Sequence, residues 1–184
     1  MNGSVAKIRK WTWKEAFADA LEGAELGKAP YQNFVGYCYD VGRGVGKDIH
    51  LAACWYERAA RNGSTDGMFN LALMWEYGQG RQCNARQATQ LYEKAARRGH
   101  LQAQCNLGVN YLGGIGVRRD IQEGFRWIRR AARRGDDKAQ YILGRAYLDG
   151  DGVRKSETHA ITWLTKAAKA GHAKARRLLR SIQR

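Results

Sequence analysis

The chain has 184 residues, of which 44% are hydrophobic, and its 32 basic and 17 acidic residues give a formal net charge of +15. This length suits one well-packed domain, and no apolar run approaches the roughly 20 residues that a membrane-spanning helix needs. The N-terminal segment is charged and lacks the apolar stretch of a secretory signal. We therefore expect a cytoplasmic protein without a transmembrane segment.

The first predicted helix follows a short segment, residues 1–10, that is expected to be weakly ordered. The helix covers 12–26, with Thr12 as its N-cap and Glu15 as the capping-box partner. It aligns with the second helix of the repeats that follow. We therefore expect residues 11–26 to form an N-terminal capping helix.

The rest of the sequence repeats with a period of 36 residues. Equivalent positions carry the same kind of residue, such as Leu107 and Leu143 in the first helix and Trp127 and Trp163 in the second. A single helix pair of this size buries too little to be stable alone, so the pairs must stack. The predicted fold is all-α, a right-handed α-solenoid in one domain over 1–184. Its four helix-turn-helix repeats cover 27–62, 63–98, 99–134 and 135–170, and a C-terminal capping helix covers 171–184.

The third repeat shows the local signals most clearly. Its first helix is followed by Gly114 and Gly116, which suit a turn with positive φ. Asp120 then stands where the second helix needs an N-cap, with Glu123 as its capping-box partner.

These residues match a known pattern, A-Q-x-x-L-G-x-x-Y-x-x-G-x-G-V-x-x-D-x-x-x-A-x-x-W-x-x-x-A-A, over Ala103 to Ala132 and Ala139 to Ala168. The pattern closely resembles the Sel-1-like repeat, a relative of the tetratricopeptide repeat, and the resemblance covers about residues 27–184. It implies an adaptor or regulator of protein complexes without chemistry of its own. Three local departures affect only the regularity of turns and packing: Arg81 for a turn valine, Ser156 for a capping aspartate and Gly124 for a small alanine.

Residues that could support chemistry are sparse. The four cysteines form no C-x-x-C pair, so we expect buried free thiols, although a Cys38–Cys54 contact is geometrically possible. His100 and His172 share a position beside the glycine that joins two repeats, which indicates a structural role. No catalytic motif or acid/base pair is present. We therefore predict no enzyme activity, no cofactor and no metal.

Charge is distributed unevenly along the chain. Residues 1–98 carry 14 basic and 10 acidic residues, a net charge of +4, whereas 99–184 carry 18 and 7, a net charge of +11. Much of the excess forms a basic ridge on the second helix of the third repeat, made of Arg126, Arg129, Arg130, Arg133 and Arg134. A solvated helix face explains such a ridge, and so does long-range attraction to an acidic partner.

The exposed positions of the first helices differ from repeat to repeat, whereas the packing positions do not. By analogy with tetratricopeptide packing, they line the concave face of the solenoid and form the predicted partner-binding site. Apolar and aromatic members of this set are the type of side chain that anchors an interface. The predicted site consists of Asn33, Tyr37, Phe69, Leu73, Glu76, Gln102, Val109, Lys138, Tyr141 and Arg145, and Asp40 and Cys105 are expected on the same face.

The predicted function is a non-enzymatic protein–protein interaction module, acting as an adaptor, regulator or inhibitor. It binds a peptide or protein loop in the concave groove, and its basic surface attracts an acidic protein partner. The alternative is a nucleic-acid-associated protein that binds through the basic ridge. An immunity-type inhibitor would use the same groove as an adaptor, and only the identity of its partner would distinguish the two.

Overall fold

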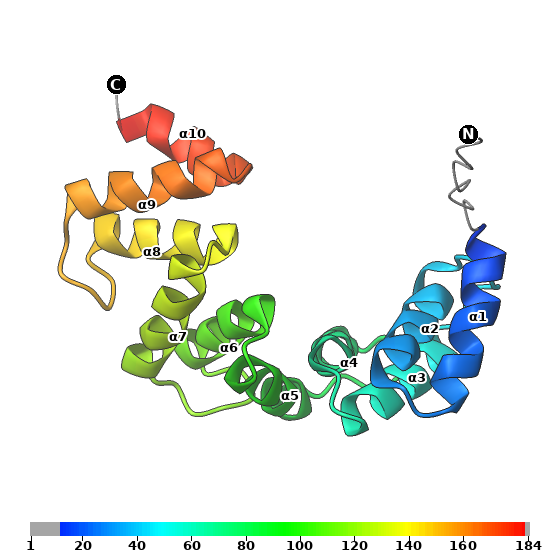
Figure 1. Ribbon diagram of the computed structural model, residues 1–184. Coiled ribbons are helices and arrows are strands. Elements are labelled where there is room, and N and C mark those ends of the chain that lie inside the picture. Colours follow the sequence, from blue (N-terminus) through cyan, green and yellow to red (C-terminus); the bar gives the residue numbers. More distant parts are fainter. Residues whose placement is uncertain (1–11, 183–184) are drawn as a thin grey trace, which may run out of the picture. The chain divides into compact units, whose positions relative to one another are not determined.

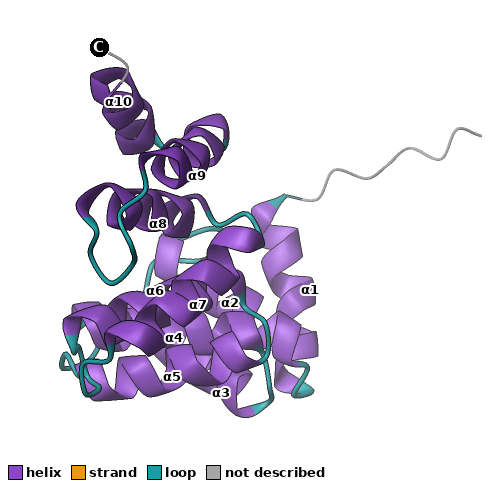
Figure 2. Ribbon diagram, turned by 90° about the vertical axis from the view of Figure 1, so that its left-hand side faces the viewer, coloured by secondary structure: helices purple, strands orange, loops and turns teal. Residues whose placement is uncertain are grey.

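The computed structural model describes residues 12–182, which form ten α-helices and no strand (Figures 1 and 2). The all-α fold predicted from the sequence is confirmed, and the expectation for residues 1–10 lies outside the described range. The helices are α1 (Trp13–Glu25), α2 (Ala29–Val41), α3 (Ile49–Arg61), α4 (Thr65–Tyr77), α5 (Ala85–Arg97), α6 (Leu101–Gly113), α7 (Ile121–Arg133), α8 (Asp137–Asp149), α9 (Glu157–Lys169) and α10 (Ala173–Ile182).

The helices belong to two compact units, and the boundary between them along the chain falls within α4, between Gly67 and Met68. In the first unit α2 packs on both α1 and α3. In the second unit each helix from α5 to α10 packs on the next one along the chain. The even-numbered helices are the first helices of the repeats and the odd-numbered ones the second. That the whole chain forms a single domain stays a prediction.

In the first, third and fourth repeats the two helices approach closely because the first helix has a glycine at one position, namely Gly36, Gly108 and Gly144. A Cβ atom on Gly108 of α6 would lie 2.8 Å from the side chain of Ile128 on α7, and one on Gly144 of α8 would lie 2.7 Å from Leu164 on α9. Ile128 and Leu164 are completely buried. Glycine therefore makes room for a large apolar side chain in these pairs, whereas the second repeat has the small residue Ala72 at the equivalent position.

The turns and caps follow the predictions with one correction. Gly114 and Gly116 have φ values of 68° and 66°, and Thr12 forms the predicted capping box with Glu15. Asp120 caps α7 by accepting a hydrogen bond of 2.9 Å from the Glu123 N–H. The capping box predicted there is wrong, because the Asp120 N–H donates to the carbonyl of Tyr111 at 2.9 Å.

Buried glutamines join consecutive repeats. In the third repeat, the Gln104 Nε2 donates to the Ala96 carbonyl at the end of α5, at 3.1 Å. Arg134 completes the arrangement by donating to the Gln104 Oε1 at 3.2 Å and to the Gly99 carbonyl at 2.7 Å. In the first repeat, the Asn62 Nδ2 donates in the same way to the Gln32 Oε1 at 2.9 Å and to the Gly27 carbonyl at 3.2 Å.

The fourth repeat lacks this last partner. Gln140 donates to the Ala132 carbonyl at 3.1 Å, but alanine stands at position 170, where the other two repeats have Arg134 and Asn62. The Gln140 Oε1 is consequently buried with no hydrogen-bond partner among the described residues. Such an unsatisfied acceptor destabilises the fold.

We therefore expect Ala170→Asn to stabilise the protein, because its amide can donate to the Gln140 Oε1 and the Gly135 carbonyl. The gain should be about 1 kcal/mol, or a rise in Tm of roughly 2–4 °C, measured by thermal unfolding followed by circular dichroism. Ala170→Leu, which adds no donor, is the control. If Ala170→Asn also stabilises a Gln140→Met variant, the gain does not come from this hydrogen bond.

Candidate protein-interaction surfaces

A surface pocket of about 430 Å³ lies between α8 and α10 in the second unit. It brings together two of the predicted partner-binding residues, Tyr141 and Arg145, with Lys174 and Arg177, which the sequence analysis did not place in the site. Its lining comprises Tyr141, Arg145, Leu148, Asp149, Lys174, Arg177, Leu178 and Ser181. We name it the α8–α10 pocket.

Side chains of the α8–α10 pocket are held by neighbouring groups. The Tyr141 ring stacks on the ring of His172 with centroids 4.5 Å apart, and the His172 Nδ1 accepts a hydrogen bond of 3.2 Å from the Ala175 N–H at the start of α10. The structural role predicted for this histidine is thus confirmed. Arg145 forms an ion pair of 3.1 Å with Asp149, and this hydrogen bond raises the pKa of Arg145.

The charge of the α8–α10 pocket is positive. It contains three basic side chains, Arg145, Lys174 and Arg177, and one acidic side chain, Asp149. The Arg145–Asp149 pair is about half exposed on both sides, so an anionic ligand can replace Asp149 at little cost. The pocket therefore combines an aromatic wall with a surplus of cationic donors.

Other predicted residues of the second unit are used partly for internal packing. Phe69 stacks on His100 with ring centroids 4.5 Å apart, which repeats the Tyr141–His172 contact two joints earlier. Glu76 accepts a hydrogen bond from the hydroxyl group of Tyr92. The expectation that Cys105 is exposed is wrong: only 1% of the residue is accessible, because it lies in the core beside α7 and α8.

The remaining predicted residues are exposed or half-buried. Gln102 and Lys138 are exposed, and the Lys138 Nζ donates to the Asn106 side chain at 3.0 Å, which links α8 to α6. Leu73 and Val109 are half-buried on α4 and α6. Asn33 and Tyr37 are half-buried on α2, in the first unit.

The basic ridge lies along α7, and its five arginines line a second pocket of about 550 Å³. Three of them are engaged within the repeat. The Arg130 guanidinium lies 5.5 Å from the ring centroid of Trp127, Arg126 pairs with Glu123 at 3.3 Å, and Arg134 binds Gln104 as described above. Arg129 and Arg133 form no hydrogen bond or ion pair with the described residues.

The stacking of a cation on tryptophan recurs in other repeats. Arg58 lies 4.6 Å from the ring of Trp55, and Lys166 lies 4.5 Å from the ring of Trp163. A basic residue three positions after a tryptophan therefore covers its ring on the helix surface. Sequence analysis placed Arg130 in the basic ridge but did not identify this structural reason for its position.

The described residues include the four cysteines and other side chains that could serve as metal ligands. All four cysteines are free, and the possible Cys38–Cys54 contact is not formed, because Cys38 is buried and Cys54 is exposed. Residues 12–182 contain no group of three or more side chains that could hold a metal ion. Within that range, no helix has the length and apolar character needed to cross a membrane.

Repeated helix pairs, closed by small residues and joined by glycines, define an α-helical repeat protein. A family model described as the Sel1 repeat matches residues 29–64, 65–100, 101–136 and 137–172. The chain therefore belongs to the Sel1 repeat family, and the α-solenoid fold and the resemblance inferred from the sequence are confirmed. Comparison with curated proteins gave no match.

Solved structures agree with this assignment. A protective antigen present in uropathogenic Escherichia coli strains is 39% identical, with a TM-score of 0.82, over 86% of this chain and 34% of its own. A Sel1 repeat protein from Oxalobacter formigenes is 34% identical, with a TM-score of 0.85, over 91% of this chain and 66% of its own. Helicobacter pylori cysteine rich protein B is 25% identical, with a TM-score of 0.57, over 72% of this chain and 96% of its own.

This chain thus spans about a third of the Escherichia coli protein and just under two thirds of the Oxalobacter formigenes protein. Sel1 repeat proteins generally mediate protein–protein interactions, and the repeat is a non-catalytic scaffold. The coarse functional class predicted from the sequence is therefore supported. The absence of enzyme activity in this chain itself stays a prediction.

The expectation of buried thiols is wrong for two of the four cysteines, which are exposed, and we therefore expect the cysteines to differ in reactivity. Burial raises the pKa values of Cys38 and Cys105, whereas Cys54 and Cys83 are exposed. Since the thiolate is the reactive form, Cys54 and Cys83 should react rapidly with a thiol reagent at about pH 8, and Cys38 and Cys105 only after unfolding. Mass spectrometry of the labelled peptides measures this, and rapid labelling of Cys105 in the native protein would contradict its placement in the core.

Proposed function

We propose that this protein is a non-enzymatic interaction module that binds a segment of a partner protein at the first-helix face of its second unit, with the α8–α10 pocket as the anchoring site. The observation that carries this proposal is the convergence of Tyr141 and Arg145 with Lys174 and Arg177 around one pocket. An aromatic ring beside two or three cations suits a short segment with an acidic and an apolar side chain.

Two features of the α8–α10 pocket support binding of such a segment. Tyr141 is held by its stacking on His172, so binding loses little side-chain entropy there. The arginine side chains offer planar donors that match a carboxylate. The surrounding second unit is strongly basic, which accelerates encounter with an acidic partner. Adaptor, regulator and inhibitor are roles that this one binding mode would serve equally.

The basic ridge on α7 supports the alternative, binding of nucleic acid. Arg129 and Arg133 are available for phosphate contacts, and the pocket beside them is wide. However, Arg126, Arg130 and Arg134 already have partners within the repeat, and Trp127 is buried beneath Arg130. No exposed aromatic ring on α7 offers a stacking platform for bases. We therefore favour a protein partner.

An affinity capture from a lysate of the source organism, with nuclease and moderate salt, tests the two surfaces against each other. We expect the wild-type chain to retain a partner that an Arg145→Asp/Arg177→Asp variant loses. Arg118→Asp, a charge reversal in the exposed turn between α6 and α7, is the control and should retain it. A partner lost only from an Arg129→Glu/Arg133→Glu variant would move the site to the basic ridge, as would recovery of nucleic acid when nuclease is omitted.

The aromatic wall gives a second, quantitative prediction for the captured partner. Tyr141→Ala removes the anchoring ring and should weaken binding by about 2 kcal/mol, roughly 30-fold, mainly through faster dissociation. Surface plasmon resonance with the purified partner measures both rates. Tyr141→Phe is the control, because it keeps the stacked ring. Equal affinities for Tyr141→Ala and the wild type would show that the α8–α10 pocket does not hold the partner.

A further inference from the structure

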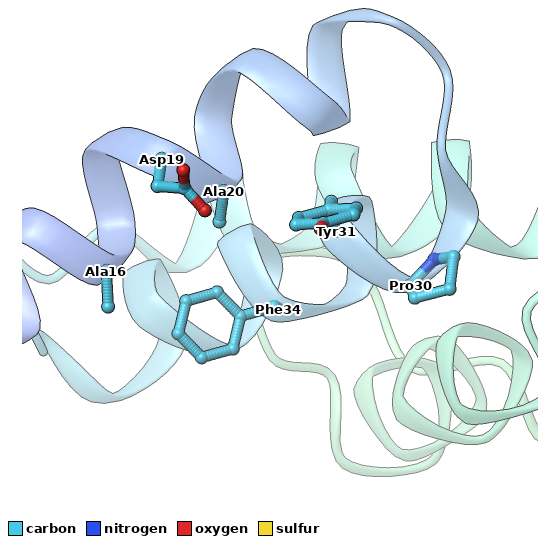
Figure 3. Close-up of a pocket in the computed structure, with 6 residues that line it drawn as sticks. All are labelled: Ala16, Asp19, Ala20, Pro30, Tyr31 and Phe34. Carbon is cyan, nitrogen blue, oxygen red and sulfur yellow. The ribbon is translucent and has the colours of Figure 1, made fainter. Parts of the chain in front are cut away.

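A pocket of about 340 Å³ lies between α1 and α2 in the first unit, with Asp19 on α1 and the rings of Tyr31 and Phe34 on α2 (Figure 3). It shares no residue with the α8–α10 pocket. Asp19 is the only charged side chain among its lining residues, and two alanines form its floor. We name it the α1–α2 pocket. It is lined by Ala16, Asp19, Ala20, Pro30, Tyr31 and Phe34.

Asp19 stands at a position that the other second helices use for packing. At the 36-residue period it aligns with Trp55, Leu91, Trp127 and Trp163. Trp55 and Trp127 are buried. A carboxylate cannot take such a buried place without a partner, and Asp19 is accordingly exposed. Asp19 therefore does not serve the packing that this position serves in the repeats.

The charge of this surface is reversed as well. Three residues after the tryptophan, the other second helices place a cation over its ring, as with Arg58, Arg130 and Lys166. Helix α1 has Glu22 at the equivalent position, and Glu22 is exposed. Where the repeats supply a cation, α1 thus presents groups that attract one.

The two rings of the α1–α2 pocket are held by their neighbours. Phe34 stacks on Trp13 with ring centroids 6.2 Å apart and ring planes 9° apart. Tyr31 packs on Gly23 of α1, where a Cβ atom would lie 2.8 Å from the ring. Phe34 is half-buried and Tyr31 is 39% exposed, so both keep accessible surface. A ligand that binds against these rings does not have to order them first.

Aromatic rings in this part of the chain already attract cations. The Arg43 guanidinium lies 4.8 Å from the ring centroid of Trp13, and the Lys28 ammonium lies 5.7 Å from that of Tyr31. Neither cation lines the α1–α2 pocket, and Asp19 forms no hydrogen bond or ion pair with the described residues. The pocket therefore offers ring surface and a carboxylate to a cation from another molecule.

We propose that the α1–α2 pocket binds an arginine side chain presented by an apolar segment of a partner protein. The stem of the arginine lies against Phe34 and Tyr31, and its guanidinium donates two parallel hydrogen bonds to the Asp19 carboxylate. This site goes beyond the proposed function, because its ligand has the opposite charge to the segment expected at the α8–α10 pocket.

The chemistry of the α1–α2 pocket selects this occupant. An acidic segment or a nucleic-acid phosphate would be repelled by Asp19 and Glu22. A wholly apolar segment would take water from the Asp19 carboxylate without replacing its hydrogen bonds. Arginine suits the site better than lysine, because its planar and weakly hydrated guanidinium both stacks on rings and matches a carboxylate.

Titration with a pair of peptides tests the proposal. The probe is acetyl-Ala-Leu-Arg-Leu-Ala-amide, and its control carries citrulline, which keeps the shape of arginine without its charge. Two-dimensional amide NMR of the isotope-labelled full chain measures binding. The arginine peptide should shift the signals of Asp19, Tyr31 and Phe34 with a Kd of about 1 mM or less. The citrulline peptide should bind about fivefold more weakly or worse.

Two variants locate the binding. Asp19→Asn should weaken the arginine peptide about fivefold, to the level of the citrulline peptide. Phe34→Leu keeps an apolar side chain and removes the ring, so it should weaken the arginine peptide and leave the citrulline peptide unchanged. A purely structural role of Phe34 would affect both peptides alike. Circular dichroism checks that each variant is folded.

Matched controls separate this site from the one in the proposed function. Asp151→Asn makes the same change as Asp19→Asn in an exposed turn of the second unit. Arg145→Gln/Arg177→Gln removes two cations of the α8–α10 pocket. Both variants should bind the arginine peptide as the wild type does, whether or not the α8–α10 pocket holds a partner.

Several results would overturn the proposal. These are the absence of a saturable shift with the arginine peptide, equal binding of the two peptides, and wild-type affinity in Asp19→Asn. A change in the Asp19 and Phe34 signals when the chain alone is diluted would assign the pocket to a second copy. Peptide binding that becomes about tenfold tighter in a Lys7→Gln/Arg9→Gln/Lys10→Gln variant would assign it to the chain's own basic segment.

Discussion

The packing of each helix pair depends on a contact between a glycine or alanine of the first helix and a large residue of the second. At Gly108 and Gly144 the missing Cβ allows Ile128 and Leu164 to reach the backbone of the facing helix. An alanine there would have to displace a buried side chain from its rotamer or move a helix. The turn within each repeat must reverse the direction of the chain so that the small residue of the first helix lies against the large residue of the second.

Around that contact, polar groups vary from repeat to repeat without changing the packing. Tyr92 pairs with Glu76 in the second repeat, whereas the equivalent residues in the third are Ile128 and Leu112. The first pair satisfies its polar groups by a hydrogen bond, and the second pair has no polar group to satisfy. Where two repeats join, Asn62 and Arg134 are different donors to equivalent glutamine side chains. In the fourth repeat the Gln140 Oε1 has no such donor among the described residues, and the apolar contact between Gly144 and Leu164 is nevertheless formed.

The fold could be predicted from the sequence because it depends on periodic positions, which one chain displays four times. The candidate surface was predicted only in part, because exposure depends on neighbours that periodicity does not reveal. Cys105 shares its repeat position with Tyr141, yet it is buried, since a cysteine is small enough to be covered at the joint. The positions of Arg130 and Lys166 have a structural cause, the stacking on Trp127 and Trp163, that a count of charges could not show.

Departures from the repeat are more informative here than the repeat itself. A glycine replaces alanine at position 23 of α1, where a Cβ would lie 2.8 Å from the Tyr31 ring, and tyrosine replaces the usual small residue at position 31. The two changes compensate each other, so the α1–α2 contact is preserved by exchange of volume. The net charge of +15 for the whole chain likewise conceals a local departure, since α1 carries one basic and four acidic residues.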